Sequence, residues 1–460
     1  MKDIQHIKNV YFLGIGGIGM SALARYFKFT GRNVAGYDRT QTPLTDALQE
    51  EGIDVHYEDD VKYIPTKWNP STTMAVFTPA LPDNHEELAW FRNQPIPLFK
   101  RAKVLGLICN EKWGIGVAGT HGKTTTSTII SNILDKTEKG CGAFLGGISK
   151  NFGSNLLLPK ADSPWIVAEA DEFDRSFLHL NPKLALVTSI DADHLDIYGE
   201  KEKIIESFEK YISQIKEGGK LIIKKGIDLD TSKTSAEVFN YSLEENADFT
   251  TLNLKLNEST GFYQFDLKTP EGIIANCQMN YPGLVNVENT VGACALAYFA
   301  GVKADEIKAG IKDYQGVARR FDIQFKTENK IYIDDYAHHP EELKAFITSV
   351  KALFPGKKVT GVFQPHLYSR TKDFSTEFAE SLDLLDKAIL IPLYPAREEP
   401  IPGVSSEIIF KQMKLEEKML AEKDEALEIL KNEQNEILLT MGAGDIDRMV
   451  NDIVGFLSNN

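Results

Sequence analysis

The sequence predicts an α/β protein built from three successive domains. Strands and helices alternate along the chain, glycine-rich turns twice follow a short apolar strand and open a helix, and polar residues gather after strand ends. Such alternation is typical of parallel sheets, which bind ligands at the carboxyl ends of their strands. The 460 residues also exceed what one ordinary core supports. We therefore expect domains over residues 1–108, 109–316 and 317–460.

The composition is that of a soluble globular protein, with 42% hydrophobic and 25% charged residues. No apolar run approaches the roughly 18 residues of a membrane span, and the N-terminus lacks the apolar core of a signal peptide. The four cysteines show no metal-binding spacing, and a net charge of −15 argues against a nucleic-acid binder. We expect a cytoplasmic protein without nucleic-acid or membrane partners. Because the chain is acidic overall, the binding site of an anionic substrate would need locally concentrated Lys and Arg.

The chain opens with the strand KNVYFL at residues 8–13, the turn GIGGIG and a helical stretch from Met20 to Phe29. A second strand, residues 33–37, ends at Asp38. This unit could hold a diphosphate at the helix N-terminus, with Asp38 near a ribose. By itself it is equally typical of a dinucleotide dehydrogenase or of a simple packing turn.

A third strand, residues 74–78, is followed by the basic cluster Lys100, Arg101 and Lys103. A charge run of this kind is usually a solvated helix face. We place the first domain boundary near Cys109.

The stretch WGIGVAGTHGKTTT, residues 113–126, predicts a phosphate cradle. A buried strand runs into a glycine-bearing turn, and Lys123 and Thr124 begin a helix. Backbone N–H groups, the helix N-terminus and the lysine can together bind phosphates, and the Thr124 hydroxyl can ligate Mg²⁺. Val117 occupies the place of the first glycine of the Walker pattern, so a plain strand-to-helix turn with an exposed lysine is the alternative.

Two acidic segments follow predicted strands of the second domain, EADEFD at residues 169–174 and SIDADHLD at residues 189–196. Beside a phosphate loop, this is where a metal-binding carboxylate is expected. Residues 249–279 alternate like an antiparallel insertion, and residues 286–298 return to helix.

The third domain repeats the arrangement of strands that end in polar and aromatic residues. Its strand ends carry DDYAHHP from residue 334, QPHLYSRT from residue 364, PLYPAREE from residue 392 and GAGD from residue 442. These side chains are expected at one edge of a third α/β sheet.

Taken together and in order, eight motifs resemble the Mur ligases: GIGGIGMSALAR, GTHGKTTT, EADEFDRSFLHL, IDADHLDIYG, GVARRFD, DDYAHHPEEL, FQPHLYSRT and GAGDI. The resemblance spans almost the whole chain. It implies a Rossmann-like N-terminal domain for a UDP-sugar, a central P-loop ATPase α/β domain with an antiparallel insertion, and a C-terminal Rossmann-like α/β domain for an amino acid.

The resemblance also implies the reaction. ATP, with Mg²⁺ or Mn²⁺, phosphorylates the muramoyl carboxylate of UDP-N-acetylmuramate, and the amine of L-alanine attacks the acyl phosphate. An amide forms, and ADP and phosphate are released, as a step of peptidoglycan precursor synthesis in the cytoplasm. A homodimer is among the assemblies that the resemblance admits.

Site residues carry over by position in the motifs. The UDP-sugar is expected to contact Gly16, Gly17, Ile18, Gly19, Met20, Ser21 and Asp38. ATP is expected to contact Gly119, Thr120, His121, Gly122, Lys123, Thr124, Thr125, Asn286, Asn289, Arg319, Asp334 and Asp335. L-alanine is assigned to Tyr336, His338, His366 and Arg370. Metal binding is assigned to Thr124, Glu169 and His194, and catalysis to Lys123, His194, Arg319 and His338.

Three positions depart from the family pattern. Val285 stands where a His is usual, Ser189 replaces a common Asn, and Leu367 stands where many members have Arg. A sister ligase that adds a recycled tripeptide to the same sugar is the main alternative. A non-catalytic UDP-sugar binder or a dehydrogenase is disfavoured, because Lys123 and Glu169 are intact and no hydride-transfer site is visible.

Overall fold

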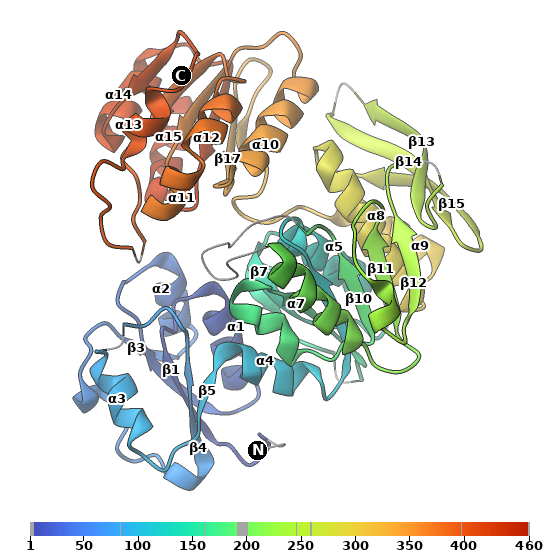
Figure 1. Ribbon diagram of the computed structural model, residues 1–460, viewed down its shortest axis with the longest axis vertical. Coiled ribbons are helices and arrows are strands. Elements are labelled where there is room, and N and C mark those ends of the chain that lie inside the picture. Colours follow the sequence, from blue (N-terminus) through green and yellow to red (C-terminus); the bar gives the residue numbers. More distant parts are fainter. Residues whose placement is uncertain are drawn as a thin grey trace. The chain divides into compact units, whose positions relative to one another are not determined.

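The computed structural model describes residues 4–82, 84–160, 162–190, 201–244, 246–257, 260–396 and 398–458. They form two compact units (Figure 1). The first unit comprises Met1–Leu256, Tyr263–Asn280 and Val287–Gln315, and the second comprises Asn257–Phe262, Tyr281–Asn286 and Gly316–Asn460. The fold is α/β, as the sequence predicts. The expected boundary at residues 108 and 109 lies inside the first unit, and the domain boundaries stay a prediction.

The N-terminal part of the first unit is a parallel five-stranded sheet in the order β3-β2-β1-β4-β5. Its strands are β1 (Asn9–Leu13), β2 (Asn33–Tyr37), β3 (Asp54–His56), β4 (Thr73–Phe77) and β5 (Leu98–Lys100). Its helices and 3-10 turns are α1 (Ile18–Phe29), α2 (Pro43–Glu50), η1 (Val61–Tyr63), η2 (Pro70–Thr72), α3 (Glu86–Arg92) and α4 (Arg101–Cys109). β1 is buried along its whole length because it pairs with β2 on one side and β4 on the other.

The central sheet has seven strands in the order β12-β11-β10-β6-β9-β7-β8. Its strands are β6 (Trp113–Ala118), β7 (Gly142–Ser149), β8 (Ser154–Leu157), β9 (Trp165–Ala170), β10 (Leu184–Val187), β11 (Lys220–Lys224) and β12 (Glu237–Tyr241). Helices and turns are α5 (Lys123–Asp135), η3 (Phe173–His179), α7 (Lys201–Ser213), η4 (Thr231–Lys233), α8 (Leu284–Phe299) and α9 (Ala304–Asp313). Ala118 pairs with Ala170 of β9 and Val187 of β10, so the segments after these three strands emerge at one edge.

A separate three-stranded sheet follows, with the order β13-β14-β15 (Figure 1). It is formed by β13 (Thr250–Asn257), β14 (Phe262–Thr269) and β15 (Gly272–Met279), and β14 and β15 are antiparallel. The predicted antiparallel insertion is therefore present.

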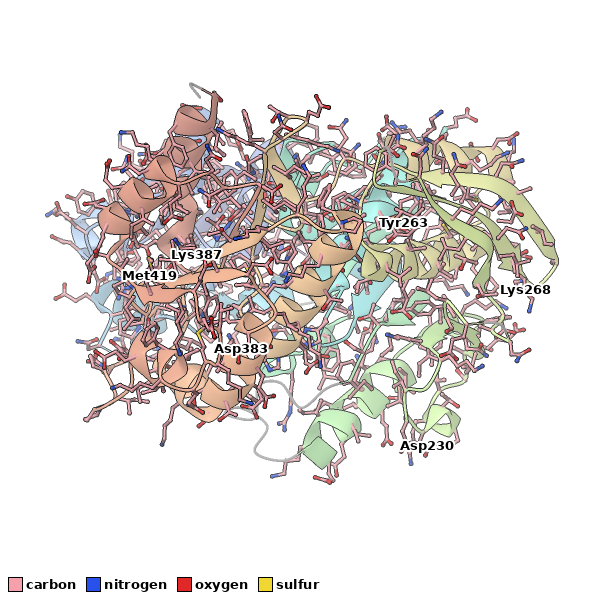
Figure 2. The ribbon with its side chains drawn as sticks, turned by 90° about the horizontal axis from the view of Figure 1, so that it is seen from above. Asp230, Tyr263, Lys268, Asp383, Lys387 and Met419 are labelled. Atoms are coloured by element: carbon pink, nitrogen blue, oxygen red, sulfur yellow. The ribbon has the colours of Figure 1, made fainter. Side chains whose placement is uncertain are left out.

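The second unit is built on a six-stranded sheet in the order β16-β17-β21-β18-β19-β20. Its strands are β16 (Asp322–Lys326), β17 (Ile331–Asp335), β18 (Val359–Phe363), β19 (Lys387–Leu390), β20 (Lys418–Leu420) and β21 (Ile437–Met441). Its helices and turn are α10 (Pro340–Leu353), α11 (Tyr368–Asp373), α12 (Ser375–Leu382), α13 (Ser406–Phe410), α14 (Lys423–Asn432), η5 (Asp445–Met449) and α15 (Val450–Ser458). Only β16 runs antiparallel to its neighbour, and Figure 2 marks Lys387 and Met419 on the adjacent strands β19 and β20.

Within the first unit, the N-terminal and central sheets share one hydrophobic cluster, which includes Phe27 of α1 and Phe144 of β7. Asn155 of β8 adds polar links: its amide donates to Ile18 O at 2.6 Å and to Ser21 Oγ at 2.9 Å, and accepts from Arg25 at 2.6 Å. The helix that opens after the first glycine turn is thereby anchored to the central sheet. Among the described residues, no helix is long and apolar enough to span a bilayer.

Candidate functional site

The turn after β6 is braced by Ser189, which lies just after the end of β10. Ser189 Oγ accepts the N–H of His121 at 2.8 Å and lies 2.8 Å from Thr120 Oγ1, and its carbonyl accepts the N–H of Thr120 at 3.2 Å. Ser189 replaces the Asn that is common in the family pattern, and it nevertheless holds the loop in place. The turn ends at Gly122, whose φ of +79° favours glycine, and α5 then begins at Lys123.

The side chain of Lys123 lies inside the turn and is largely buried. Its ammonium donates to Gly119 O at 2.6 Å and to Thr120 O at 3.3 Å, and lies 3.0 and 2.9 Å from the two carboxylate oxygens of Glu172. Burial alone would lower the pKa of Lys123, but Glu172 and nearby acids raise it above its usual value. The lysine is thus charged and held in place, rather than exposed as the alternative interpretation expected.

Thr124 and Glu169 supply two oxygen ligands suited to Mg²⁺. Thr124 Oγ1 donates to Glu169 Oε2 at 2.9 Å, which joins the first turn of α5 to the end of β9. Mg²⁺ is usually held by one or two protein oxygens together with substrate phosphates and waters, so this pair fits the ion. Among the described residues no group of three or more His, Cys, Asp or Glu side chains forms a metal cage, and His194 lies outside the described residues.

The two predicted adenine-binding asparagines have different surroundings. Asn289 of α8 is buried, and a Cβ added to Gly122 would lie 2.6 Å from its Oδ1, so this side chain packs directly on the phosphate turn. Asn286, in the first turn of α8, donates to Pro282 O at 2.7 Å. Val285, which replaces the usual His, is 48% exposed. Thr125 is buried in the first turn of α5.

The first glycine turn is closed by Asp38, at the end of β2. Its carboxylate accepts the N–H of Gly16 at 2.7 Å. Gly17 caps α1, Ile18 is 37% exposed, and Met20 and Ser21 are buried in the first turns of the helix. This turn presents the N-terminus of a 12-residue helix, the local geometry that favours an anion.

Arg101 is a residue whose place near the site the sequence interpretation missed. It was assigned to a solvated helix face, but a Cβ added to Gly19 would lie 2.7 Å from Arg101 Nη1, so its guanidinium packs on the first turn of α1. The same side chain lies 3.6 Å from Asp171. The cation is thus beside the first glycine turn, where an anionic substrate needs one. The only sequence signal is its position at the start of α4, directly after β5.

In the second unit, Arg319 is held at the carboxyl ends of β17 and β21. Its guanidinium donates to Asp334 Oδ2 at 3.2 Å and to Gly442 O at 2.7 Å, and lies 3.6 Å from Asp447. It also lies 5.1 Å from the centre of the Tyr336 ring. The backbone of Arg319 has a φ of +61°, a conformation that costs free energy in a residue other than glycine and that clusters at functional sites.

Asp334 and Asp335 are buried at the end of β17. Asp334 accepts the Thr440 hydroxyl at 2.6 Å, and Asp335 accepts the N–H groups of Phe321 at 2.6 Å and Ala337 at 2.7 Å. Burial raises the pKa of both carboxyls, that of Asp335 to about 6. Both side chains are bonded into the protein, where they fix the loop that carries Tyr336 and His338.

His338 lies in that loop, and its Nδ1 lies 2.9 Å from Tyr336 O and 3.3 Å from Glu342. Burial lowers its pKa to about 4, and Glu342 opposes the shift only in part. The imidazole is therefore neutral near pH 7. Its ring centre is 6.0 Å from that of His366, which stacks on Tyr394.

Arg370 lies in α11, which begins after Leu367. Leu367 has a φ of +71°, a strained value for a branched residue, at the position where many relatives carry Arg. The structure therefore brings Tyr336, His338 and His366 together at one sheet edge, with Arg370 close enough to influence the pKa of His338.

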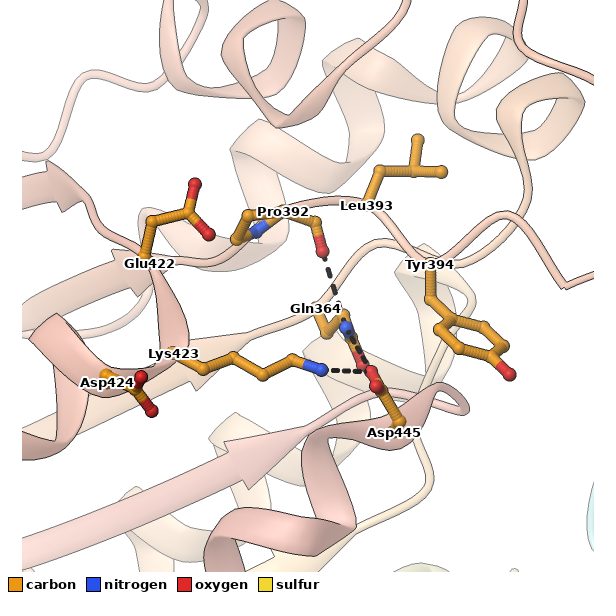
Figure 3. Close-up of a pocket in the computed structure, with 8 residues that line it drawn as sticks. All are labelled: Gln364, Pro392, Leu393, Tyr394, Glu422, Lys423, Asp424 and Asp445. Atoms are coloured by element: carbon orange, nitrogen blue, oxygen red, sulfur yellow. Dashed lines mark hydrogen bonds and ion pairs between the residues drawn. The ribbon is translucent and has the colours of Figure 1, made fainter. Parts of the chain in front are cut away.

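A cavity of about 420 Å³ opens at the same sheet edge, beyond Tyr394. It is lined by Gln364, Pro392, Leu393, Tyr394, Glu422, Lys423, Asp424 and Asp445. Figure 3 shows Gln364 and Lys423 converging on Asp445, and the Gln364 amide donates to Asp445 at 2.9 Å. The neighbouring strands β21 and β18 lead to η5 and α11, and the carboxyl ends of such strands are where open α/β sheets bind ligands.

Comparison with known families matches nearly the whole chain. Residues 9–113 match the family described as "Mur ligase family, catalytic domain", residues 117–297 match "Mur ligase middle domain", and residues 319–444 match "Mur ligase, glutamate ligase domain".

Several curated relatives carry the name UDP-N-acetylmuramate–L-alanine ligase. The protein of Phocaeicola vulgatus is 49% identical over 99% of both chains. Those of Porphyromonas gingivalis and Flavobacterium johnsoniae are 46% and 44% identical over at least 98% of each chain. Among solved structures, the UDP-N-acetylmuramate–alanine ligase of Thermotoga maritima gives a TM-score of 0.83 at 25% identity, over 98% of this chain and 100% of that one. A murein peptide ligase of Psychrobacter arcticus shares the fold, with a TM-score of 0.71 at 21% identity over 98% and 99% of the two chains.

Proposed function

The chain belongs to the Mur ligase family, and we propose that it ligates L-alanine to the muramoyl carboxylate of UDP-N-acetylmuramate at the expense of ATP. The observation that carries the proposal is the turn after β6, in which a buried, charged Lys123 and the Thr124–Glu169 pair lie at one edge of the central sheet. A phosphoryl group and its metal ion need this combination. Relatives with this ligase name at 42–49% identity over the full length support the choice of substrates.

The order of the steps follows from the chemistry of the carboxylate. An amine does not displace an oxide from a carboxylate, so the oxygen must first become a leaving group. Transfer of the γ-phosphoryl from ATP gives the acyl phosphate and ADP, and the amine of L-alanine then forms the amide and releases phosphate. The products belong to peptidoglycan precursor synthesis.

Lys123 binds the β- and γ-phosphates and offsets the charge that shifts during phosphoryl transfer. Thr124 and Glu169 would hold Mg²⁺ or Mn²⁺, which would supply positive charge to offset that of the phosphates. Asn289 and Asn286 contact the adenine, Arg319 contacts phosphate, and Asp334 or Asp335 contacts the ribose.

The UDP-sugar binds at the first glycine turn, where the N–H groups from Gly16 to Gly19 face its diphosphate. Asp38 now accepts the Gly16 N–H, so the diphosphate must displace it or bind beside it. Arg101, which packs on Gly19, adds the cation that this anion requires.

L-alanine binds at the edge of the C-terminal sheet. Arg370 takes its carboxylate, and His338 and His366 orient the amine. A neutral His338 can accept a hydrogen bond from that amine and orient it, whereas a pKa of about 4 makes the imidazole a weak base near pH 7. The cytoplasm is the compartment that supplies these substrates, and a homodimer stays a prediction that light scattering would check.

The deciding experiment measures phosphate release with ATP and Mg²⁺ while the other substrates are added singly and together. We expect release only when UDP-N-acetylmuramate and L-alanine are both present. Rapid ATP hydrolysis without the sugar nucleotide, or a clear preference for a tripeptide over L-alanine, would count against the proposal, the latter in favour of the tripeptide-adding sister ligase.

A further inference from the structure

Glu172 is a buried acid to which the proposed reaction assigns no role. It follows β9 by two residues, is 1% exposed, and places both carboxylate oxygens within 3.0 Å of Lys123 Nζ. Burial raises the pKa of this carboxyl and Lys123 opposes the shift. A buried carboxylate costs several kcal/mol unless it is paired, and a buried pair is weak evidence of stabilisation. We therefore look for the role of Glu172 in the position that it gives to the Lys123 ammonium.

A lysine ammonium sits on a flexible four-carbon stem and has three N–H donors. In this structure the acceptors around Lys123 come from two sides: Gly119 O and Thr120 O from the turn, and Glu172 from the segment after β9. The backbone carbonyls alone would leave the stem free to move along the turn. The Glu172 carboxylate adds a charged acceptor from a second segment and thereby restricts where the ammonium can lie.

The neighbouring acids of the same segment are engaged elsewhere. Glu169 accepts the hydroxyl of Thr124 at 2.9 Å, and Asp171 lies 3.6 Å from Arg101. The three acids of EADEFD that precede Phe173 therefore face three different groups: the metal-site hydroxyl, the arginine beside the first glycine turn, and the phosphate-loop lysine.

We propose that Glu172 is a positioning residue, which holds the ammonium of Lys123 at the mouth of the phosphate turn throughout phosphoryl transfer. The inference rests on the proposed ligase reaction. A phosphate oxygen replaces the longest contact of the ammonium, that to Thr120 O at 3.3 Å, while the Glu172 contact persists. Glu172 itself touches neither substrate nor nucleotide.

Glu172→Gln keeps the size of the side chain and removes its charge. Because misplacement of a catalytic group by about 1 Å can cost on the order of 100-fold, we expect kcat to fall by roughly 10- to 100-fold. The KM for ATP should change by less than about threefold, because the turn and the metal pair still bind the phosphates. Glu172→Asp, which keeps the charge on a shorter stem, should give an intermediate kcat.

A double-mutant cycle separates positioning from a merely structural role. If Glu172 acts through Lys123, Glu172→Gln should lower kcat in the wild-type background and have almost no effect on the residual rate of Lys123→Ala. Glu87→Gln is the matched control, since Glu87 is also fully buried and paired, with His56 and Tyr11 of the N-terminal sheet. It should lower thermal stability and leave kcat per folded molecule unchanged.

Several outcomes would overturn the proposal: an unchanged kcat in Glu172→Gln, a rise in the KM for ATP at constant kcat, or additive effects in the cycle. If Glu172→Gln does not fold, Glu172→Asp carries the same cycle, and a wild-type kcat in that variant together with additivity would equally overturn it. Failure of the ligase reaction itself would appear differently, as wild-type protein that releases no phosphate with both substrates present.

Discussion

The hydroxyl of Thr124 and the carboxylate of Glu169 lie 2.9 Å apart, across the junction between α5 and β9. The hydroxyl donates a hydrogen bond to the carboxylate, so the two oxygens are adjacent beside the turn after β6. A divalent cation bound beside them would be ligated by both oxygens, in place of the hydrogen bond that now joins them.

We expect Glu169→Gln to raise the Mg²⁺ concentration required for half-maximal activity by about 10-fold or more, because an amide oxygen carries no charge to offset that of the ion. Thr124→Val should act in the same direction, whereas Thr124→Ser, which keeps the hydroxyl, should resemble the wild type. The measurement is phosphate release against Mg²⁺ and Mn²⁺ concentration. A crystal with nucleotide and Mn²⁺ in which neither side chain reaches the ion would sink the assignment.

Replacing Lys123 with Ala should cost about 2.7–4 kcal/mol of transition-state stabilisation, by analogy with the loss of one preorganised donor. The charge that follows the γ-phosphoryl is removed, and Glu172 is left buried without the cation that faces it. Steady-state kcat measures the effect. Lys136→Ala, at the far end of α5 and paired with Asp313 on the surface, is the control. Turnover within a few-fold of wild type would show that the loop has another role.

Arg370→Lys should raise the KM for L-alanine far more than that for ATP. The rise should correspond to a loss of roughly 1.5–3 kcal/mol of binding free energy, the cost of one charged hydrogen bond. A guanidinium grips a carboxylate with two parallel bonds and an ammonium does not. Leu367 supplies no second cation, so Arg370 bears more of the binding. Arg448→Lys, exposed on η5, should leave all three KM values unchanged. An unaltered KM for L-alanine would remove Arg370 from the pocket.

His338 should make the protein less stable in mild acid. Burial lowers its pKa from 6.5 to about 4, so below pH 6.5 the unfolded chain takes up a proton that the folded chain refuses. The free energy of unfolding should therefore fall by about 1–3 kcal/mol more in wild type than in His338→Gln between pH 6.5 and 4. Chemical denaturation across that range checks the difference. The carboxyl of Asp335, whose raised pKa has the opposite effect, is present in both proteins, and equal slopes would refute the assigned burial of His338.

Much of the fold could be predicted from the sequence because the central strands are continuous apolar runs. ILLTM, which directly precedes the GAGD motif, is β21, since it pairs on both sides and every residue is buried. The three-residue strands β3, β5 and β20 were missed, because segments so short carry no period and are defined only by the strand beside them.

The site shows the same limit. The motif GTHGKTTT predicts a phosphate turn, because glycines, a lysine and a threonine at this spacing are typical of phosphate-binding turns. Arg101 and Glu172 have no such local pattern. Arg101 contacts Gly19, which lies 82 residues away in the sequence, and Glu172 contacts Lys123, which lies 49 residues away. Only the packing of these distant segments brings each pair together. The lowered pKa of His338 was equally invisible, since sequence reasoning gives a histidine its ordinary value.

The anchoring of α1 to β8 through Asn155 decides where this protein can be recombined with its relatives. An exchange of the second compact unit has to carry Asn257–Phe262 and Tyr281–Asn286 together with the residues from Gly316 onward, because all three segments belong to it. A crossover at residue 108 would instead separate Phe27 from Phe144, and Arg25 and Ser21 from their amide partner. Chimeras that transplant amino-acid specificity should therefore be soluble, while those that transplant only the sugar-nucleotide domain should need Asn155 and its apolar neighbours carried along from the same parent.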